Sequence, residues 1–175
     1  MATLMGIDFA ALSLKDALDL AVLIEEEAKE RYEDLAEQME LHHTPEAARF
    51  FRFMASNEEK HHAELAARRL ALFGSEPARV NRGMLFEVEA PEFDEVRVFM
   101  SAREALQVSF RAEKKAWAFF SEAAPRVQDA AVKELFIELR NEEVHHQRLV
   151  LAEMERTPPK SAPKHADVAD EPVAQ

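Results

Sequence analysis

Two short segments of the chain carry the same pattern of carboxylates and imidazoles. Residues 57–65 read NEEKHHAEL and residues 141–149 read NEEVHHQRL, so Asn, Glu, Glu, His, His and Leu recur at the same offsets. Each segment contains Glu-x-x-His twice, in adjacent registers. Because residues three apart share one face of a helix, either register projects a carboxylate and an imidazole in the same direction.

Two more carboxylates stand alone in stripes of otherwise uncharged residues. The stripe at 18, 21, 25, 28, 32, 35 and 39 contains Glu25, and the stripe at 99, 102, 106, 109, 113, 116 and 120 contains Glu113. A carboxylate is rarely buried without a partner, because its removal from water is costly. Both positions therefore need a cation, and a salt bridge to Lys29 or Arg111 is the simpler alternative to a metal.

Periodicity indicates the register of the later segment. Glu143 and His146 continue a stripe whose other members, at 132, 136, 139 and 150, are apolar. The competing line through Glu142 and His145 passes another acid at 138. We therefore expect Glu143 and His146 to face the interior.

The earlier segment is less clear, because two adjacent lines are both rich in apolar residues. Glu59 and His62 share a line with apolar residues at 51, 55 and 66, whereas Glu58 and His61 share their line with apolar residues at 50, 54 and 65. We choose Glu59 and His62, partly by matching the later segment, and the register of Glu58 and His61 stays open as the alternative.

The elements that must position these residues are long helices. Helical stripes extend from a cap at Ser13 to about 39, from Thr44-Pro45 to Gly74, from about Asp94 to the break at Pro125, and from about 132 to 156. Residues 74–93 hold two Gly and two Pro without a sustained period, which indicates a connection. We predict an all-α fold in which two antiparallel helix hairpins are joined by a long crossover into a four-helix bundle.

The two halves of this predicted bundle repeat each other. Glu25 recurs 88 residues later as Glu113, and the Glu-x-x-His segments lie 84 residues apart. A pseudo-twofold bundle places the two segments opposite each other at mid-height. Four carboxylates and two imidazoles meeting there are neutralised by two divalent cations, and these ligands suit iron or manganese. Open positions remain for oxygen, peroxide or water.

The residues resemble the ferritin-like superfamily, and within it the rubrerythrin and erythrin branch. The ligands come in the expected order from four helices: Glu25, Glu59, His62, Glu113, Glu143 and His146. The resemblance implies a site of two iron ions, with manganese or zinc as substitutes. It also implies that Glu59 and Glu143 bridge the ions, that Glu25 and Glu113 are terminal ligands, and that each His holds one ion.

The activity implied is oxidation of ferrous iron by peroxide or dioxygen, with iron storage or buffering as the alternative. A di-iron oxygenase of organic substrates and a purely structural helical module are further alternatives. The chain departs from rubrerythrins in lacking Cys, so it has no rubredoxin domain, and electrons must come from ferrous iron or a separate donor protein. Ala116 also replaces the extra carboxylate typical of peroxide-reducing members, which favours simpler iron oxidation.

Composition limits the remaining classes. Lys and Arg total 22 against 34 Asp and Glu, and the net charge of −12 argues against nucleic acid. Neither a membrane span nor a signal peptide is evident, so we expect a cytoplasmic protein with no membrane partner. We expect one domain over 1–156, a Pro-rich disordered tail over 157–175, and a homodimer or higher homo-oligomer.

Overall fold

A computed structural model describes residues 8–84 and 101–157, and every structural statement below concerns these residues. They form α1 (Leu14–Leu41), α2 (Pro45–Phe73), a short 3₁₀ helix η1 (Arg82–Met84), α3 (Ala102–Ala123) and α4 (Ala130–Arg156). The described part contains no strand, and none of its helices is long and apolar enough to cross a membrane. The prediction of an all-α fold is confirmed.

Side-chain caps set where α1, α3 and α4 begin. The Ser13 hydroxyl accepts a hydrogen bond from the Asp16 amide at 3.1 Å, and the Asp129 carboxylate accepts from the first amides of α4. At α3, Ser101 and Glu104 form a capping box in which each side chain bonds the other residue's backbone amide. These bonds satisfy amides that have no partner within the helix.

The expected start of the third helix near Asp94 is wrong. Ser101 has an extended backbone, with φ −71° and ψ 158°, so α3 begins at Ala102. The physical reason is that the capping box of Ser101 and Glu104 fixes the beginning of α3, whereas the apolar spacing suggested an earlier start. Residues 94–100, including Phe99 of the predicted stripe, lie outside the described residues, as does the predicted tail beyond Thr157.

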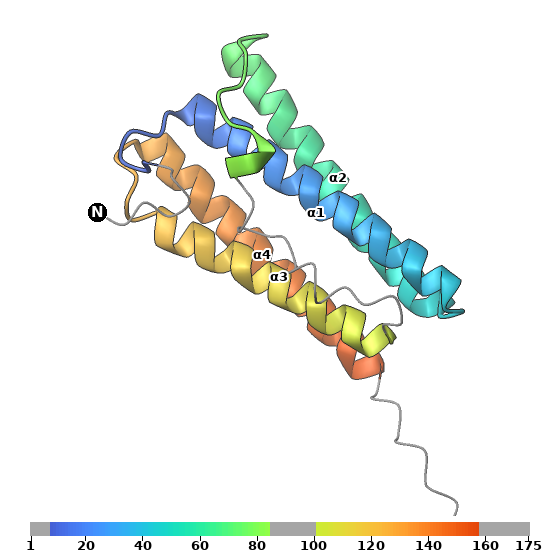
Figure 1. Ribbon diagram of the computed structural model, residues 1–175. Coiled ribbons are helices and arrows are strands. Elements are labelled where there is room, and N and C mark those ends of the chain that lie inside the picture. Colours follow the sequence, from blue (N-terminus) through green and yellow to red (C-terminus); the bar gives the residue numbers. More distant parts are fainter. Residues whose placement is uncertain (1–7, 85–100, 158–175) are drawn as a thin grey trace, which may run out of the picture.

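The helices form two hairpins that lie side by side, α1 with α2 and α3 with α4 (Figure 1). The end of α2 lies beside the beginning of α1, where Arg69 contacts Asp19. The beginning of α3 lies at the opposite end, where Leu106 belongs to the same apolar cluster as Met39. The connection between α2 and α3 therefore joins opposite ends of the bundle, as the predicted crossover requires.

A polar layer separates two apolar clusters along every helix. In α1, residues 17–24 belong to one cluster and residues 32–39 to the other, with Glu25 between them. Glu58 in α2, Glu113 in α3 and Glu143 in α4 each lie between segments of the two clusters in the same way. The bundle is thus held by apolar packing above and below one charged layer at mid-height.

A buried ion-pair cluster closes the end of the bundle where α1 begins. Asp19 is 8% exposed and binds Lys15 Nζ at 3.0 Å and Arg69 Nε at 2.6 Å. The same two basic side chains also donate to backbone carbonyls of Gly74, Glu76 and Pro77, which follow α2. Asp19 therefore orients the two donors that attach the start of the crossover to α1.

Asp19→Asn should lower the free energy of unfolding by about 1–3 kcal/mol, because two charge-assisted bonds lose their acceptor charge. Burial opposes ionisation of Asp19, but Arg69 and Lys15 outweigh it and lower its pKa below the ordinary 3.8. This contribution should be present above pH 3.8 and disappear as the pH falls through the lowered pKa. Urea denaturation at pH 7 measures it, and Asp34→Asn on the exposed side of α1 is the matched control. Equal stability of the two variants at pH 7 would contradict the role of Asp19.

Candidate metal centre

The charged layer is made by side chains from all four long helices. Glu25, Glu58, Glu113 and Glu143 come from α1, α2, α3 and α4 in turn, and each is at most 4% exposed. His146 of α4 is 2% exposed and lies among them. The prediction that Glu25, Glu113, Glu143 and His146 face the interior agrees with these positions.

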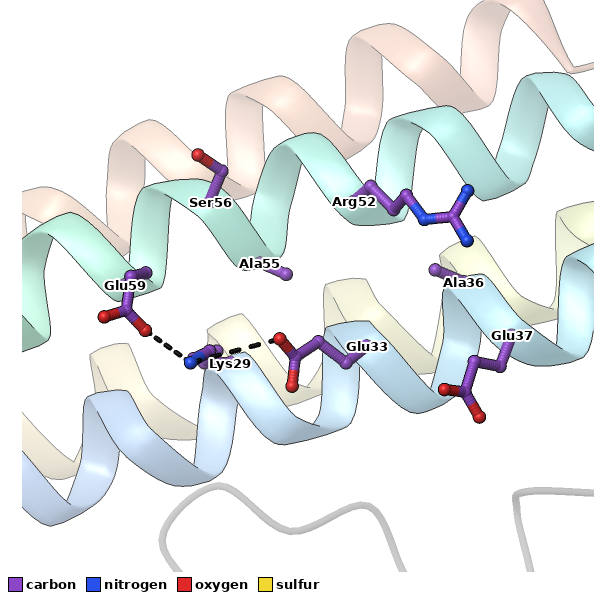
Figure 2. Close-up of a pocket in the computed structure, with 8 residues that line it drawn as sticks. All are labelled: Lys29, Glu33, Ala36, Glu37, Arg52, Ala55, Ser56 and Glu59. Atoms are coloured by element: carbon purple, nitrogen blue, oxygen red, sulfur yellow. Dashed lines mark ion pairs between the residues drawn. The ribbon is translucent and has the colours of Figure 1, made fainter.

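The second helix presents the other register to the core. Glu59 points outward, where its side chain is 51% exposed and pairs with Lys29 of α1. Figure 2 shows this pair at the edge of a surface groove between α1 and α2, with Lys29 also reaching toward Glu33. The structure does not bring Glu59 and His62 into the cluster. It brings Glu58 and His61, and the chosen register is corrected accordingly.

Helix geometry explains the correction. At about 100° per residue, Glu58 lies about 20° from the direction of Phe51, whereas Glu59 lies about 80° from it. The expected stripe took two successive steps of four, from 51 to 55 to 59, and each step turns the stripe further from the core. The residues that face the core instead alternate steps of three and four: Phe51, Met54, Glu58, His61 and Leu65. All of them are buried except His61, which is half-buried.

Glu58 lies between the two histidines. One of its carboxylate oxygens is 3.7 Å from His61 Nδ1, and the other is 3.3 Å from His146 Nδ1. The two imidazole rings are nearly parallel, with centroids 5.3 Å apart and an interplanar angle of 12°. His61 also approaches Glu25 at 3.8 Å, and His146 approaches Glu113 at 3.4 Å. Each histidine thus approaches one carboxylate of its own, Glu25 for His61 and Glu113 for His146, and both histidines approach Glu58.

Neighbouring polar groups hold Glu113 in place. The Tyr32 hydroxyl donates to Glu113 Oε1 and lies 2.8 Å from the Ser109 hydroxyl, with both side chains fully buried. Gln147 Nε2 donates to the Glu113 backbone carbonyl at 3.3 Å. These contacts join α1, α3 and α4 and orient one carboxylate oxygen, while Glu113 Oε2 faces His146.

The ionisation of the cluster reflects uncompensated negative charge. Burial and the nearby Glu58 raise the pKa of Glu25 well above its ordinary value. Burial disfavours the charged form of His146, but Glu113, Glu58 and Glu25 outweigh this effect and raise its pKa to about 10. Burial likewise opposes ionisation of Glu113, yet His146 lowers its pKa. At neutral pH, the proton on His146 therefore supplies part of the positive charge that the layer needs.

The donor set fits a pair of divalent cations. Three overlapping groups have potential ligand atoms within 4.8 Å of one another: Glu58 with His61 and His146, Glu113 with Glu143 and His146, and Glu25 with His61 and Glu142. Two buried atoms, His61 Nδ1 and Glu113 Oε2, form no hydrogen bond among the described residues. Carboxylate oxygens and imidazole nitrogens without thiolates are ligands typical of iron and manganese. One cation would lie nearer His61 and the other nearer His146.

Sequence reasoning did not identify two residues at this site, Ser109 and Gln147, and it left Glu142 open between a solvated residue and a carboxylate for iron entry. Ser109 was visible only as a polar residue within the stripe of Glu113, and nothing in the spacing distinguished Gln147 as a partner of α3. Glu142 lies on a line that appeared solvated, and the structure shows it half-buried within ligand distance of Glu25 and His61.

A four-helix bundle with one long crossover and a buried layer of glutamate and histidine is the architecture of ferritin-like carboxylate proteins. The Rubrerythrin family model matches residues 16–154, and the chain belongs to the rubrerythrin family. This family implies a di-iron centre, in agreement with the donor set described above.

A solved structure supports the same fold. The crystal structure of an uncharacterized conserved protein from Magnetospirillum magnetotacticum MS-1 superposes with a TM-score of 0.72 at 30% sequence identity. The match covers 86% of this chain and 99% of that chain. The comparison with curated proteins gives no match.

The corrected register predicts opposite results for adjacent residues of α2. Glu58→Gln should weaken binding of Co²⁺ by about tenfold or more, because it removes the carboxylate that both histidines share. Glu59→Gln should bind Co²⁺ like the unmodified protein, because Glu59 faces solvent and pairs with Lys29. Calorimetric titration measures both affinities, and circular dichroism checks that both variants fold. Normal affinity in Glu58→Gln with loss in Glu59→Gln would restore the register chosen from the sequence.

Metal binding should release protons. Because the pKa of His146 is raised to about 10, this group is protonated at pH 7 in the metal-free protein, and a cation that binds it displaces that proton. The apparent affinity should consequently fall as the pH is lowered. A pH indicator in weakly buffered solution measures the release during Mn²⁺ addition, with Glu59→Gln as control. Stoichiometric binding of Mn²⁺ without proton release would contradict the prediction that the ligands of the cations are protonated in the metal-free protein.

Proposed function

We propose that this protein is a non-haem di-iron oxidoreductase that oxidises ferrous iron with peroxide or dioxygen. The observation that carries the proposal is the position of Glu58, whose two oxygens face His61 and His146 at 3.7 and 3.3 Å. A single carboxylate placed between two imidazoles is suited to bridge two metal ions. Membership of the rubrerythrin family supports the same assignment.

In this proposal Glu25 and His61 would hold one ion and Glu113 and His146 the other, and Glu58 and Glu143, from facing hairpins, would be available to both. Six protein ligands for two ions leave positions free for a small oxidant. When bound, two ferrous ions supply the two electrons that convert one peroxide and two protons to two waters, or one dioxygen and two protons to hydrogen peroxide.

The chain's own residues prepare this chemistry in three ways. Tyr32 and Ser109 orient Glu113 through the contacts described above, which reduces the rearrangement needed when a cation binds. The apolar clusters on both sides of the layer shield it from solvent along the length of the bundle. The proton that His146 holds in the metal-free protein, because its pKa is raised to about 10, leaves when a cation binds.

The small side chain at Ala116 supports iron oxidation over a dedicated peroxidase. Ala116 is fully buried in α3, one turn after Glu113, and it offers no further carboxylate to the centre. Since the chain contains no Cys, electrons for repeated turnover come from further ferrous iron or from a separate donor protein. We place the protein in the cytoplasm as a homodimer or higher oligomer, which solution measurements will test.

Anaerobic protein loaded with two Fe²⁺ per chain should oxidise the iron faster than free Fe²⁺ in buffer when mixed with peroxide or dioxygen. Stopped-flow absorbance measures both rates and identifies the preferred oxidant. Glu58→Gln should lose about tenfold or more of the rate, whereas Glu59→Gln should retain it. Uptake of many irons per chain within a large shell would favour storage, and oxidation no faster than in buffer would contradict the proposed enzyme.

A further inference from the structure

A hollow of about 220 Å³ opens on the surface between α2 and α4. Its walls include Glu64 and Arg68 from α2, and Glu138 and Glu142 from α4. Its lining also includes His61, the half-buried histidine of the candidate metal centre. The hollow therefore borders the charged layer at His61.

Two residues that line the hollow, His61 and Glu142, belong to a group that could receive a cation. Glu25, His61 and Glu142 have potential ligand atoms within 4.8 Å of one another, and Glu25 is 4% exposed. His61 Nδ1 is buried without a hydrogen bond among the described residues, and it is 3.8 Å from Glu25 Oε2. Glu142 is the member of this group that also lines the hollow together with His61. Glu142 thus lies between the surface hollow and the two candidate ligands His61 and Glu25.

The charge of the hollow favours cations. Three acids, Glu64, Glu138 and Glu142, line it against one base. That base is Arg68, whose Nη1 lies 3.3 Å from Glu138 Oε2 and so connects the two walls. An acidic concavity concentrates cations from solution, and the guanidinium of Arg68 opposes this effect.

The groove on the other side of α2 is a less suitable route. It is lined by the bases Lys29 and Arg52 as well as by acids, and Lys29 pairs with Glu59 at its edge (Figure 2). None of the buried carboxylates or histidines of the centre lines that groove. Its two bases offset most of the charge of its three acids, and a cation there meets no ligand of the centre.

We propose that hydrated divalent cations reach the centre through the hollow between α2 and α4, and that Glu142 binds each cation in transit and passes it to His61 and Glu25. This inference rests on the proposed metal centre. Glu142 acts as a relay, so it changes the rates of loading and release without determining the final affinity.

The test is the rate of Co²⁺ uptake by the metal-free full-length chain, followed by stopped-flow visible absorbance at low ionic strength. Glu142→Gln should slow association and chelator-induced release by a similar factor, about threefold or more, and leave the dissociation constant within about twofold. Arg68→Gln should accelerate association about twofold or more, because it removes the opposing charge.

Glu59→Gln is the matched control, since it removes one negative charge from the outward face of α2 and tests general electrostatic attraction. The relay is overturned if Glu142→Gln associates at the unmodified rate, if the control slows equally, or if affinity falls while the association rate is unchanged. An unchanged rate in Arg68→Gln overturns the hollow as the route. If the unmodified protein does not bind Co²⁺ stoichiometrically, both the proposed centre and the relay are contradicted. If it binds Co²⁺ normally but the variants associate at the unmodified rate, only the relay is contradicted.

Discussion

The burial of four glutamates in one layer is the constraint on which the rest of the structure depends. Each carboxylate loses most of its hydration, and the imidazolium of His146 offsets part of the resulting charge. Such a layer adds little to stability in the metal-free state. Its arrangement is understandable as a site that two divalent cations complete, because they neutralise the carboxylates that burial penalises.

The architecture compensates for this cost by confining it to one level of the bundle. Apolar clusters on both sides of the layer contain most of the large buried side chains, including Phe51, Phe120 and Phe136. At roughly 1.5 Å per residue, the 28 residues of α1 extend about 42 Å, which allows both clusters and the layer to be stacked along one helix. Long helices are therefore a requirement of the site as well as of the fold.

The two hairpins contribute to the centre in related ways, as expected from their internal repeat. Each hairpin supplies one isolated glutamate and one Glu-x-x-His pair, and the two histidines face each other with nearly parallel rings. The halves differ in their surroundings: His146 is fully buried, whereas His61 borders a hollow open to solvent. The symmetry of the ligands thus coexists with one side that borders a hollow open to solvent.

The sequence by itself determined four helices, the crossover, and the inward positions of Glu25, Glu113, Glu143 and His146. Glu25 and Glu113 are single acids in otherwise uncharged stripes, and the line that competes with Glu143 and His146 carries a further acid. The sequence did not determine the register of α2, since apolar residues occupy two adjacent faces there, as at 50 and 51 or at 54 and 55. Tertiary packing decided that choice by turning Glu58 toward α1 and α4 and leaving Glu59 to Lys29. The start of α3 was misplaced for a similar reason, because a capping box depends on backbone conformation that apolar spacing does not report.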